Sequence, residues 1–116
     1  MKLRHVTIRT AAFEEEIDFY LKFAGLTMQR DVRPMGRNMV FLANAAGDSE
    51  IEIIEKTDAA DAGNENLSIG FSCEDLDGMR AKLADAGFAP TDFVAPSPAV
   101  RFFYVKDPAG VTVQFI

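Results

Sequence analysis

The chain has 116 residues, of which 48% are hydrophobic and 26% are charged, and its net charge is -6. This length and composition are those of one globular domain rather than of a disordered chain. The acidic excess argues against a nucleic-acid binder and against an anionic membrane surface, since both need basic residues. The single cysteine, Cys73, cannot form an internal disulfide, and no apolar run approaches the length of a membrane span. We therefore expect a small cytoplasmic protein with neither a nucleic-acid nor a membrane partner.

The two halves of the sequence repeat one pattern of apolar residues. Val6 and Ile8 correspond to Ile69 and Phe71, and each pair is followed by a polar break and a helical pattern. After a register change of one residue, the correspondence continues through the last apolar run of each half. Such agreement over half the chain predicts two copies of one structural unit.

Module one, residues 1–56, begins with alternating apolar and polar residues over 3–9, which predicts a strand. A helix follows, because the apolar residues from Phe13 to Tyr20 have helical spacing and Gly25 is placed to end it. Three further strands are predicted in this module, over residues 26–33, 38–44 and 49–55.

A polar linker over 57–66 precedes module two, residues 67–116. Asp75 is placed to cap a helix and Gly87 to end it, and Asp107 begins a DPAG sequence typical of a type I turn. The predicted strands of this module cover 67–73, 91–95, 100–106 and 111–116. Two tandem βαβββ modules predict an α+β fold, with a curved, mostly antiparallel sheet around a concave ligand cavity.

Alternation along the strands decides which side chains face the helices and which face the cavity. On the first strand of each module, the cavity side carries His5 and Ser68. On the last strand it carries Glu52 and Gln114. The repeat aligns these residues in pairs, so we expect two polar cavity positions from each module.

The pattern resembles the vicinal oxygen chelate superfamily, which includes glyoxalase I, extradiol dioxygenases, fosfomycin-resistance enzymes and bleomycin-resistance proteins. The resemblance covers essentially the whole chain. It is carried by the segments HVTIRT, IDFYLKFAGL, IEIIE and VKDPAGVTVQFI. A DPxG turn followed by a strand with Glu or Gln at its fourth position is fairly specific for this superfamily. The resemblance implies a small-molecule ligand or substrate and a homodimer.

In glyoxalase I, a metal ion is held by His or Gln on the first strand of each copy and by Glu on the last. The resemblance therefore implies a divalent metal (Ni, Co, Zn, Mn or Fe) bound by His5, Glu52 and Gln114, with Glu52 also the catalytic base. Ser68 stands at the fourth ligand position, where a hydroxyl is a weak ligand, and Gln114 brings an amide without charge. By the same resemblance, Arg9 contacts the substrate, and we assign Ser68 to substrate binding as well.

Two functions fit these residues. The first is a metal-dependent lyase or isomerase of the lactoylglutathione lyase type with a degraded ligand set, although Lys56 replaces the Asn expected for glutathione recognition. The alternative is a metal-free protein of the bleomycin-resistance type, which sequesters a cationic or aromatic ligand through Glu50, Glu52 and aromatic residues near the rim. Those aromatic residues are Phe41, Phe102, Phe103 and Tyr104, and Phe103 is the one assigned to substrate binding. A ligand sensor that kept only the scaffold is a third interpretation.

Purely structural interpretations also apply to these residues. A single histidine on a strand is most often a surface residue, and arginines such as Arg9 are often rim residues. Gln114 fits a polar lining equally well, and Cys73 alternates with apolar residues as a small core residue would.

Overall fold

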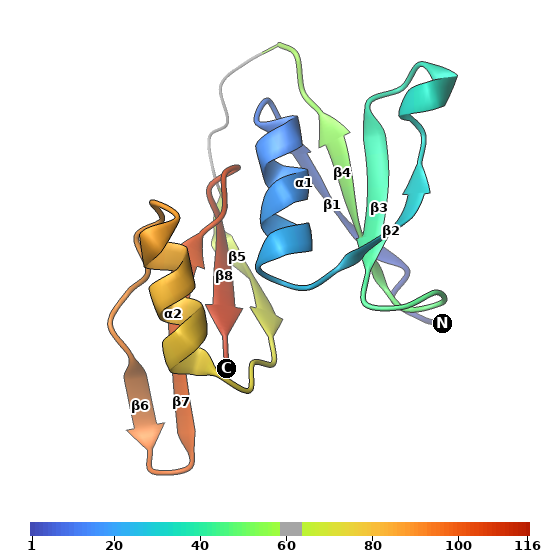
Figure 1. Cartoon of the computed structure of the whole chain (residues 1–116). Coiled ribbons are helices and arrows are strands. Elements are labelled where there is room, and N and C mark those ends of the chain that lie inside the picture. Colours follow the sequence, from blue (N-terminus) through green and yellow to red (C-terminus); the bar gives the residue numbers. More distant parts are fainter. Residues whose placement is uncertain (59–63) are drawn as a thin grey trace. The chain divides into compact units, whose positions relative to one another are not determined.

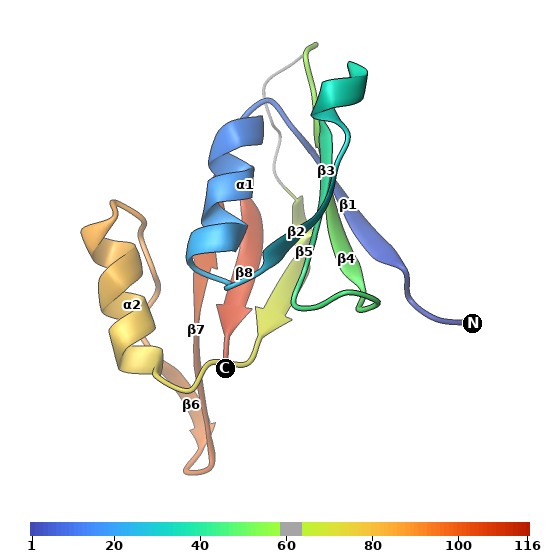
Figure 2. The ribbon, with the colours of Figure 1, turned by 45° about the vertical axis from the view of Figure 1, so that its right-hand side comes forward.

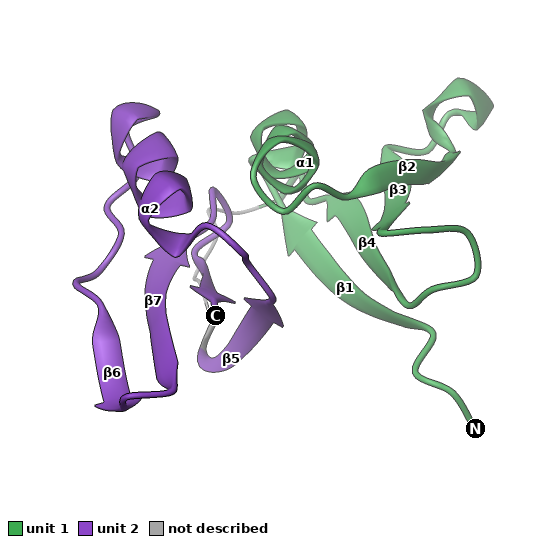
Figure 3. Cartoon of the chain, turned by 60° about the horizontal axis from the view of Figure 1, so that its bottom comes forward, with its two compact units in different colours: residues 1–61 green, residues 62–116 purple. Residues whose placement is uncertain are grey.

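The computed structural model describes residues 1–58 and 64–116, with side chains from residue 66 in the second range, and divides into two units (Figures 1 and 3). Unit 1 comprises Met1–Asp61 and unit 2 comprises Ala62–Ile116. Residues 59–63 of the predicted linker lie outside the described residues. Each unit is an α+β module, so the tandem arrangement predicted from the repeat is confirmed.

Unit 1 is a mixed four-stranded sheet with one α-helix (Figure 2). The strand order is β1-β4-β3-β2, in which β1 runs parallel to β4 and the other two pairings are antiparallel. Helix α1 contacts β1, β3 and β4. The elements are β1 (His5–Thr10), α1 (Phe13–Lys22), β2 (Thr27–Asp31), a 3₁₀ helix (Arg33–Met35), β3 (Met39–Ala43) and β4 (Glu50–Glu55).

Unit 2 repeats this topology, with the strand order β5-β8-β7-β6 and β5 parallel to β8. Strand β5 begins three residues before the strand predicted from residue 67, and β6 begins three residues after the one predicted from residue 91. The elements are β5 (Asn64–Phe71), α2 (Leu76–Asp85), β6 (Val94–Ser97), β7 (Val100–Lys106) and β8 (Val111–Phe115). Among the described residues, no helix combines the length and apolar character needed to cross a membrane.

The helix ends follow the local signals in the sequence. The Asp75 carboxylate caps α2 by accepting a hydrogen bond of 2.9 Å from the backbone N–H of Gly78. Gly25 and Gly87, which follow the two helices, have φ angles of 66° and 92°. Only glycine adopts this left-handed conformation without steric cost, so both predicted stop positions are confirmed.

The core of each unit lies between its helix and one face of its sheet. In unit 1, Ile8 on β1 and Ile53 on β4 are buried together with Phe13, Ile17 and the ring of Tyr20 from α1. Burying each such side chain stabilises the fold by about 1.5–3 kcal/mol. Because alternate residues point to opposite sides of a strand, the remaining side chains form a second face, which we call the helix-free face.

Candidate functional site

The helix-free face of unit 1 brings His5 and Glu52 together. Strands β1 and β4 are parallel neighbours, and their register places Thr7 beside Glu52 and His5 beside Glu50. His5 Nε2 lies 3.8 Å from Glu52 Oε1, and the same oxygen accepts a hydrogen bond of 2.6 Å from the Thr7 hydroxyl. The Glu52 side chain is 13% exposed and that of His5 36%, so both remain accessible to solvent.

Phe41 on β3 continues this row across the sheet. It pairs with Glu52 in the β3–β4 register and with Arg30 in the β2–β3 register. The His5 ring meets the Phe41 ring edge to face, with 6.2 Å between centroids. The guanidinium of Arg30 lies 3.8 Å from the centroid of the same ring, and Arg30 Nη2 lies 3.4 Å from Glu50 Oε1. Arg30 therefore both stacks on an aromatic ring and pairs with a carboxylate.

Arg30 reaches this face because β2 is irregular. Met28 pairs with Leu42 and Arg30 pairs with Phe41, so the register shifts between them. Regular pairing would place Arg30 opposite Val40, on the face that packs under α1. The extra residue of the bulge, Gln29, thus moves the guanidinium to the side of Glu52.

The geometry of His5 and Glu52 fits two ligands of one metal ion. Metal–nitrogen and metal–oxygen bonds are about 2.0–2.2 Å long for zinc-like ions, so atoms 3.8 Å apart can share an ion. The Thr7 hydroxyl supplies the kind of hydrogen bond that orients a ligating carboxylate. Within residues 1–58 and 64–116, no group of three or more His, Cys, Asp or Glu side chains could hold a metal. A complete shell therefore needs ligands of another kind, such as an amide oxygen or water.

In unit 2, Gln114 and Ser68 lie on the helix-free face. A Cβ atom at Gly70 would be 3.4 Å from Gln114 Oε1, so the Gln114 side chain lies directly over Gly70. Ser68 is exposed and lines a shallow pocket of about 240 Å³. The other residues that line this pocket are Asn66, Leu67, Tyr104 and Thr112.

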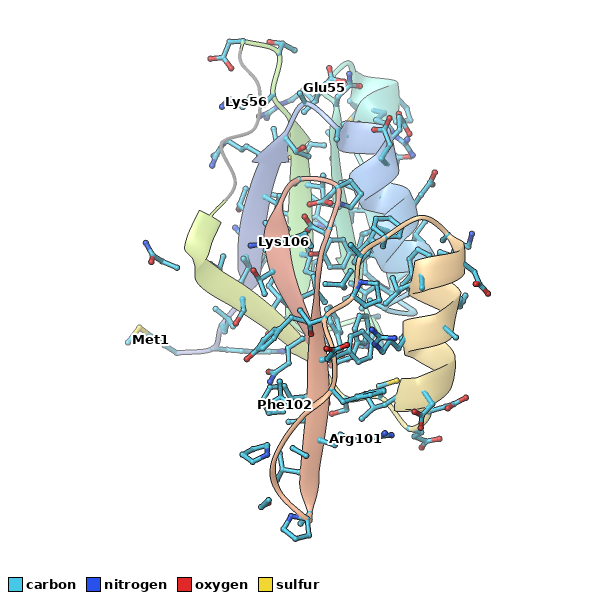
Figure 4. The ribbon with its side chains drawn as sticks, turned by 90° about the vertical axis from the view of Figure 1, so that its left-hand side faces the viewer. Met1, Glu55, Lys56, Arg101, Phe102 and Lys106 are labelled. Carbon is cyan, nitrogen blue, oxygen red and sulfur yellow. The ribbon has the colours of Figure 1, made fainter. Side chains whose placement is uncertain are left out.

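The structure corrects the substrate-binding role expected for Phe103. This side chain is 0% exposed and stacks on Phe115, with ring centroids 5.5 Å apart, so it belongs to the core of unit 2. Its neighbours Phe102 and Tyr104 alternate onto the helix-free face, where their rings meet at 5.5 Å. In Figure 4, Phe102 and Lys106 point away from α2, whereas Arg101 points toward it. These two aromatic residues, rather than Phe103, are accessible to a ligand.

Arg9 lies on β1 beyond Thr7, pairs in register with Ile54 and is exposed. Its place on the face of Thr7 follows from strand alternation. The structure therefore brings together His5 and Glu52, and places Arg9 on the same face of unit 1. It adds two residues to which the sequence had assigned no role, Thr7 and Arg30. The Thr7 position was readable from alternation, whereas that of Arg30 depends on the bulge.

Comparison with known proteins assigns the family. Residues 2–115 match the model of the Glyoxalase/Bleomycin resistance protein/Dioxygenase superfamily. No curated protein sequence matches the chain at a significant level.

Solved structures share the fold at low sequence identity. The trypanothione-dependent glyoxalase I of Leishmania major has a TM-score of 0.77 at 18% identity, over 100% of this chain and 86% of that one. The fosfomycin resistance protein FosX of Mesorhizobium loti has a TM-score of 0.77 at 14% identity, over 98% and 89%. TnmS3, an antibiotic binding protein from Streptomyces sp. CB03234, has a TM-score of 0.73 at 18% identity, over 99% and 93%. With a family model that matches nearly every residue, the chain belongs to the Glyoxalase/Bleomycin resistance protein/Dioxygenase superfamily.

Proposed function

We propose that the protein is a divalent-metal-dependent enzyme, a lyase or isomerase, that acts on a small molecule. The observation that supports this most is the arrangement of His5, Thr7 and Glu52. A histidine nitrogen and a carboxylate oxygen lie 3.8 Å apart on neighbouring strands, and a hydroxyl 2.6 Å away fixes that oxygen. Metal ligands need such support from a second layer of hydrogen bonds.

In this proposal, His5 and Glu52 hold the metal (Ni, Co, Zn, Mn or Fe) and Gln114 contributes its amide oxygen. The bound ion would act as a Lewis acid toward a substrate oxygen. Glu52 is also the base: because Thr7 engages Oε1, the other carboxylate oxygen remains to accept a proton from the substrate. Arg9 and Ser68 contact the substrate, and the enzyme works in the cytoplasm.

Metal-free binding of an aromatic ligand is the second candidate, supported by the accessible pair Phe102 and Tyr104. A cationic ligand fits unit 1 less well. Arg30 already occupies a face of the Phe41 ring and pairs with Glu50, so a ligand cation would have to displace it. The aromatic surface of unit 2 is therefore where this alternative would act.

The decisive experiment measures metal content and thermal stability of the purified protein. We expect one equivalent of metal per chain and a melting temperature that rises with added Ni, Co, Zn, Mn or Fe. At 100 times the dissociation constant, binding stabilises the folded state by about 2.7 kcal/mol. Both effects should disappear in His5→Ala and Glu52→Gln.

Glu55→Gln is the matched control, because Glu55 lies on the same strand and accepts a hydrogen bond from Asn38 instead. This variant should bind metal like the wild type. If the wild type takes up no metal and shows no metal-dependent shift, the enzyme proposal is wrong. Binding of an aromatic ligand that Phe102→Ala abolishes would then support the alternative.

A further inference from the structure

We propose that Arg30 forms an anion-binding site beside His5 and Glu52, so that the substrate is a small molecule carrying a carboxylate, phosphonate or sulfonate group. This inference names the class of substrate for the proposed function, and it rests on that function for the metal at His5 and Glu52. The anion site itself is built from unit 1 alone: the Arg30 guanidinium binds the anion, the Phe41 ring supports it, and Glu50 is its ion-pair partner.

The bulge at Gln29 is the first reason. An extra residue in an edge strand interrupts the row of backbone hydrogen bonds to the next strand. Such bulges often redirect a side chain near a functional site. Here the consequence is specific, because regular pairing would turn Arg30 toward the face that packs under α1. A residue that served only as a solvated charge on an edge strand would need no such irregularity.

The second reason is that the guanidinium is held in place yet remains accessible. Its plane is supported by the Phe41 ring at 3.8 Å, and its side chain is still 51% exposed. Within the described part of the chain, its hydrogen-bond partner is Glu50, through Nη2 at a long 3.4 Å. The Nε–H and Nη1 donors therefore remain for a planar or tetrahedral anion, the geometry that arginine recognises best.

The spacing suits a small molecule. Neighbouring strands lie about 4.8 Å apart, so the Arg30 and Glu52 backbones, separated by β3, are about 10 Å apart. The Phe41 ring fills the space between, contacted by His5 and by Arg30. A substrate of a few carbon atoms that spans this distance would reach Arg30 with its anionic group and His5 and Glu52 with the other end.

The test is a titration of the full-length protein with methylphosphonate, followed by NMR, in the absence and in the presence of Zn²⁺. Dimethyl methylphosphonate, the neutral ester, is the comparison ligand. We expect methylphosphonate to shift the Nε–H resonance of Arg30 and the ester to leave it unchanged. Arg30→Met should weaken methylphosphonate binding about tenfold or more, as loss of a charge-assisted contact implies. Arg30→Lys, which keeps the charge, should give an intermediate affinity.

Arg101→Met is the matched control. Arg101 also stacks on an aromatic ring, Phe93 at 4.1 Å, and also pairs with a carboxylate, that of Asp77 at 2.8 Å, but it points toward α2. This variant should bind methylphosphonate with the wild-type affinity. Equal affinities for the wild type and a folded Arg30→Met variant would overturn the inference.

The two proposals fail in different ways. Absence of uptake of any of the ions Ni, Co, Zn, Mn and Fe would contradict the metal-dependent function, and the metal-free titration would then decide the anion site. If the protein takes up Zn²⁺ but Arg30→Met binds methylphosphonate with wild-type affinity, the metal proposal is retained and the anion site is rejected.

Discussion

Thr7 determines how the Glu52 carboxylate is presented, because its hydroxyl donates a hydrogen bond of 2.6 Å to Oε1 from the neighbouring strand. Thr7→Val keeps the side-chain shape and removes the donor. We expect the free energy of unfolding to fall by about 1 kcal/mol, the usual net contribution of one hydrogen bond. If Glu52 ligates a metal, affinity should also fall by about 10- to 100-fold, as for other lost orienting contacts. Urea unfolding and metal titration measure the two effects.

Thr27→Val is the control for this substitution. Thr27 lies on β2 in the same sheet and donates its hydrogen bond to the backbone oxygen of Ala43 instead. This variant should leave metal affinity unchanged. Unaltered affinity in Thr7→Val as well would show that the hydroxyl does not orient Glu52.

Phe102 and Phe103 are neighbours on β7 whose side chains lie on opposite faces of the sheet. Substituting each in turn should give different losses of stability. Phe103→Ala should destabilise unit 2 by about 3–5 kcal/mol, because it leaves a cavity against Phe115 in the core. Phe102→Ala should cost far less stability, since this ring lies on the helix-free face. Chemical denaturation distinguishes them, and equal losses would contradict the assignment of the two faces.

The sequence predicted His5, Glu52, Ser68 and Gln114 on one kind of face, and the structure places His5 beside Glu52. Alternation was sufficient for this, because β1, β4 and β8 are regular. Phe103 was misplaced because it was grouped with its neighbours near the rim without regard to alternation; the register pairs Tyr104 with Gln114 and Phe103 with Phe115. Arg30 could not be predicted, since a bulge reverses alternation and depends on pairing between strands.

At the level of elements, a surface ion pair links α2 to β7. Arg101 Nη2 lies 2.8 Å from Asp77 Oδ2. The hydrogen bond from Arg101 holds the pKa of the Asp77 carboxyl below its ordinary value. A carboxyl whose pKa is lower in the folded state stabilises the protein above its unfolded pKa, about 3.9, and this contribution disappears as the pH falls through the folded value.

A double-mutant cycle at two pH values tests this link. We expect Asp77→Asn, Arg101→Gln and the double variant to show a favourable coupling near pH 7. The coupling should vanish once acid has protonated Asp77. Because both side chains are exposed and screened by solvent, we expect a small coupling. A coupling that persists in acid would mean that the carboxylate charge is not its source.

Most helices and strands were predictable, because the apolar spacing and the capping residues that define each one lie within or next to it in the sequence. Asp75, Gly87 and the Asp107 turn are each encoded within a few residues. The less accurate strand bounds are those of β5 and β6, which begin at Asn64 and Val94. Strand β6 is an edge strand with four exposed residues, so no apolar alternation marks its start.

At the level of the whole molecule, we predict a homodimer. Each sheet carries a helix on one face only, and the surface exposes apolar side chains including Leu67, Val94 and Val100. A second copy is the simplest way to cover such surface. Sedimentation equilibrium should give twice the chain mass of 12.8 kDa. A single-chain mass at all concentrations would contradict this prediction.

The parallel pairing of β1 with β4 has a consequence for the order of events during folding. His5 and Glu52 belong to the first and last strands of unit 1, so every other element of that unit lies between them in the chain. We expect these distant segments to pair late in folding, because the chain loses loop-closure entropy before the contacts between them form. The site is thus assembled only when the module closes, and a growing or partly unfolded chain holds the two side chains apart. Only the fully folded unit would then bind a ligand at this pair. Such a ligand would stabilise the folded unit by joining its first and last strands.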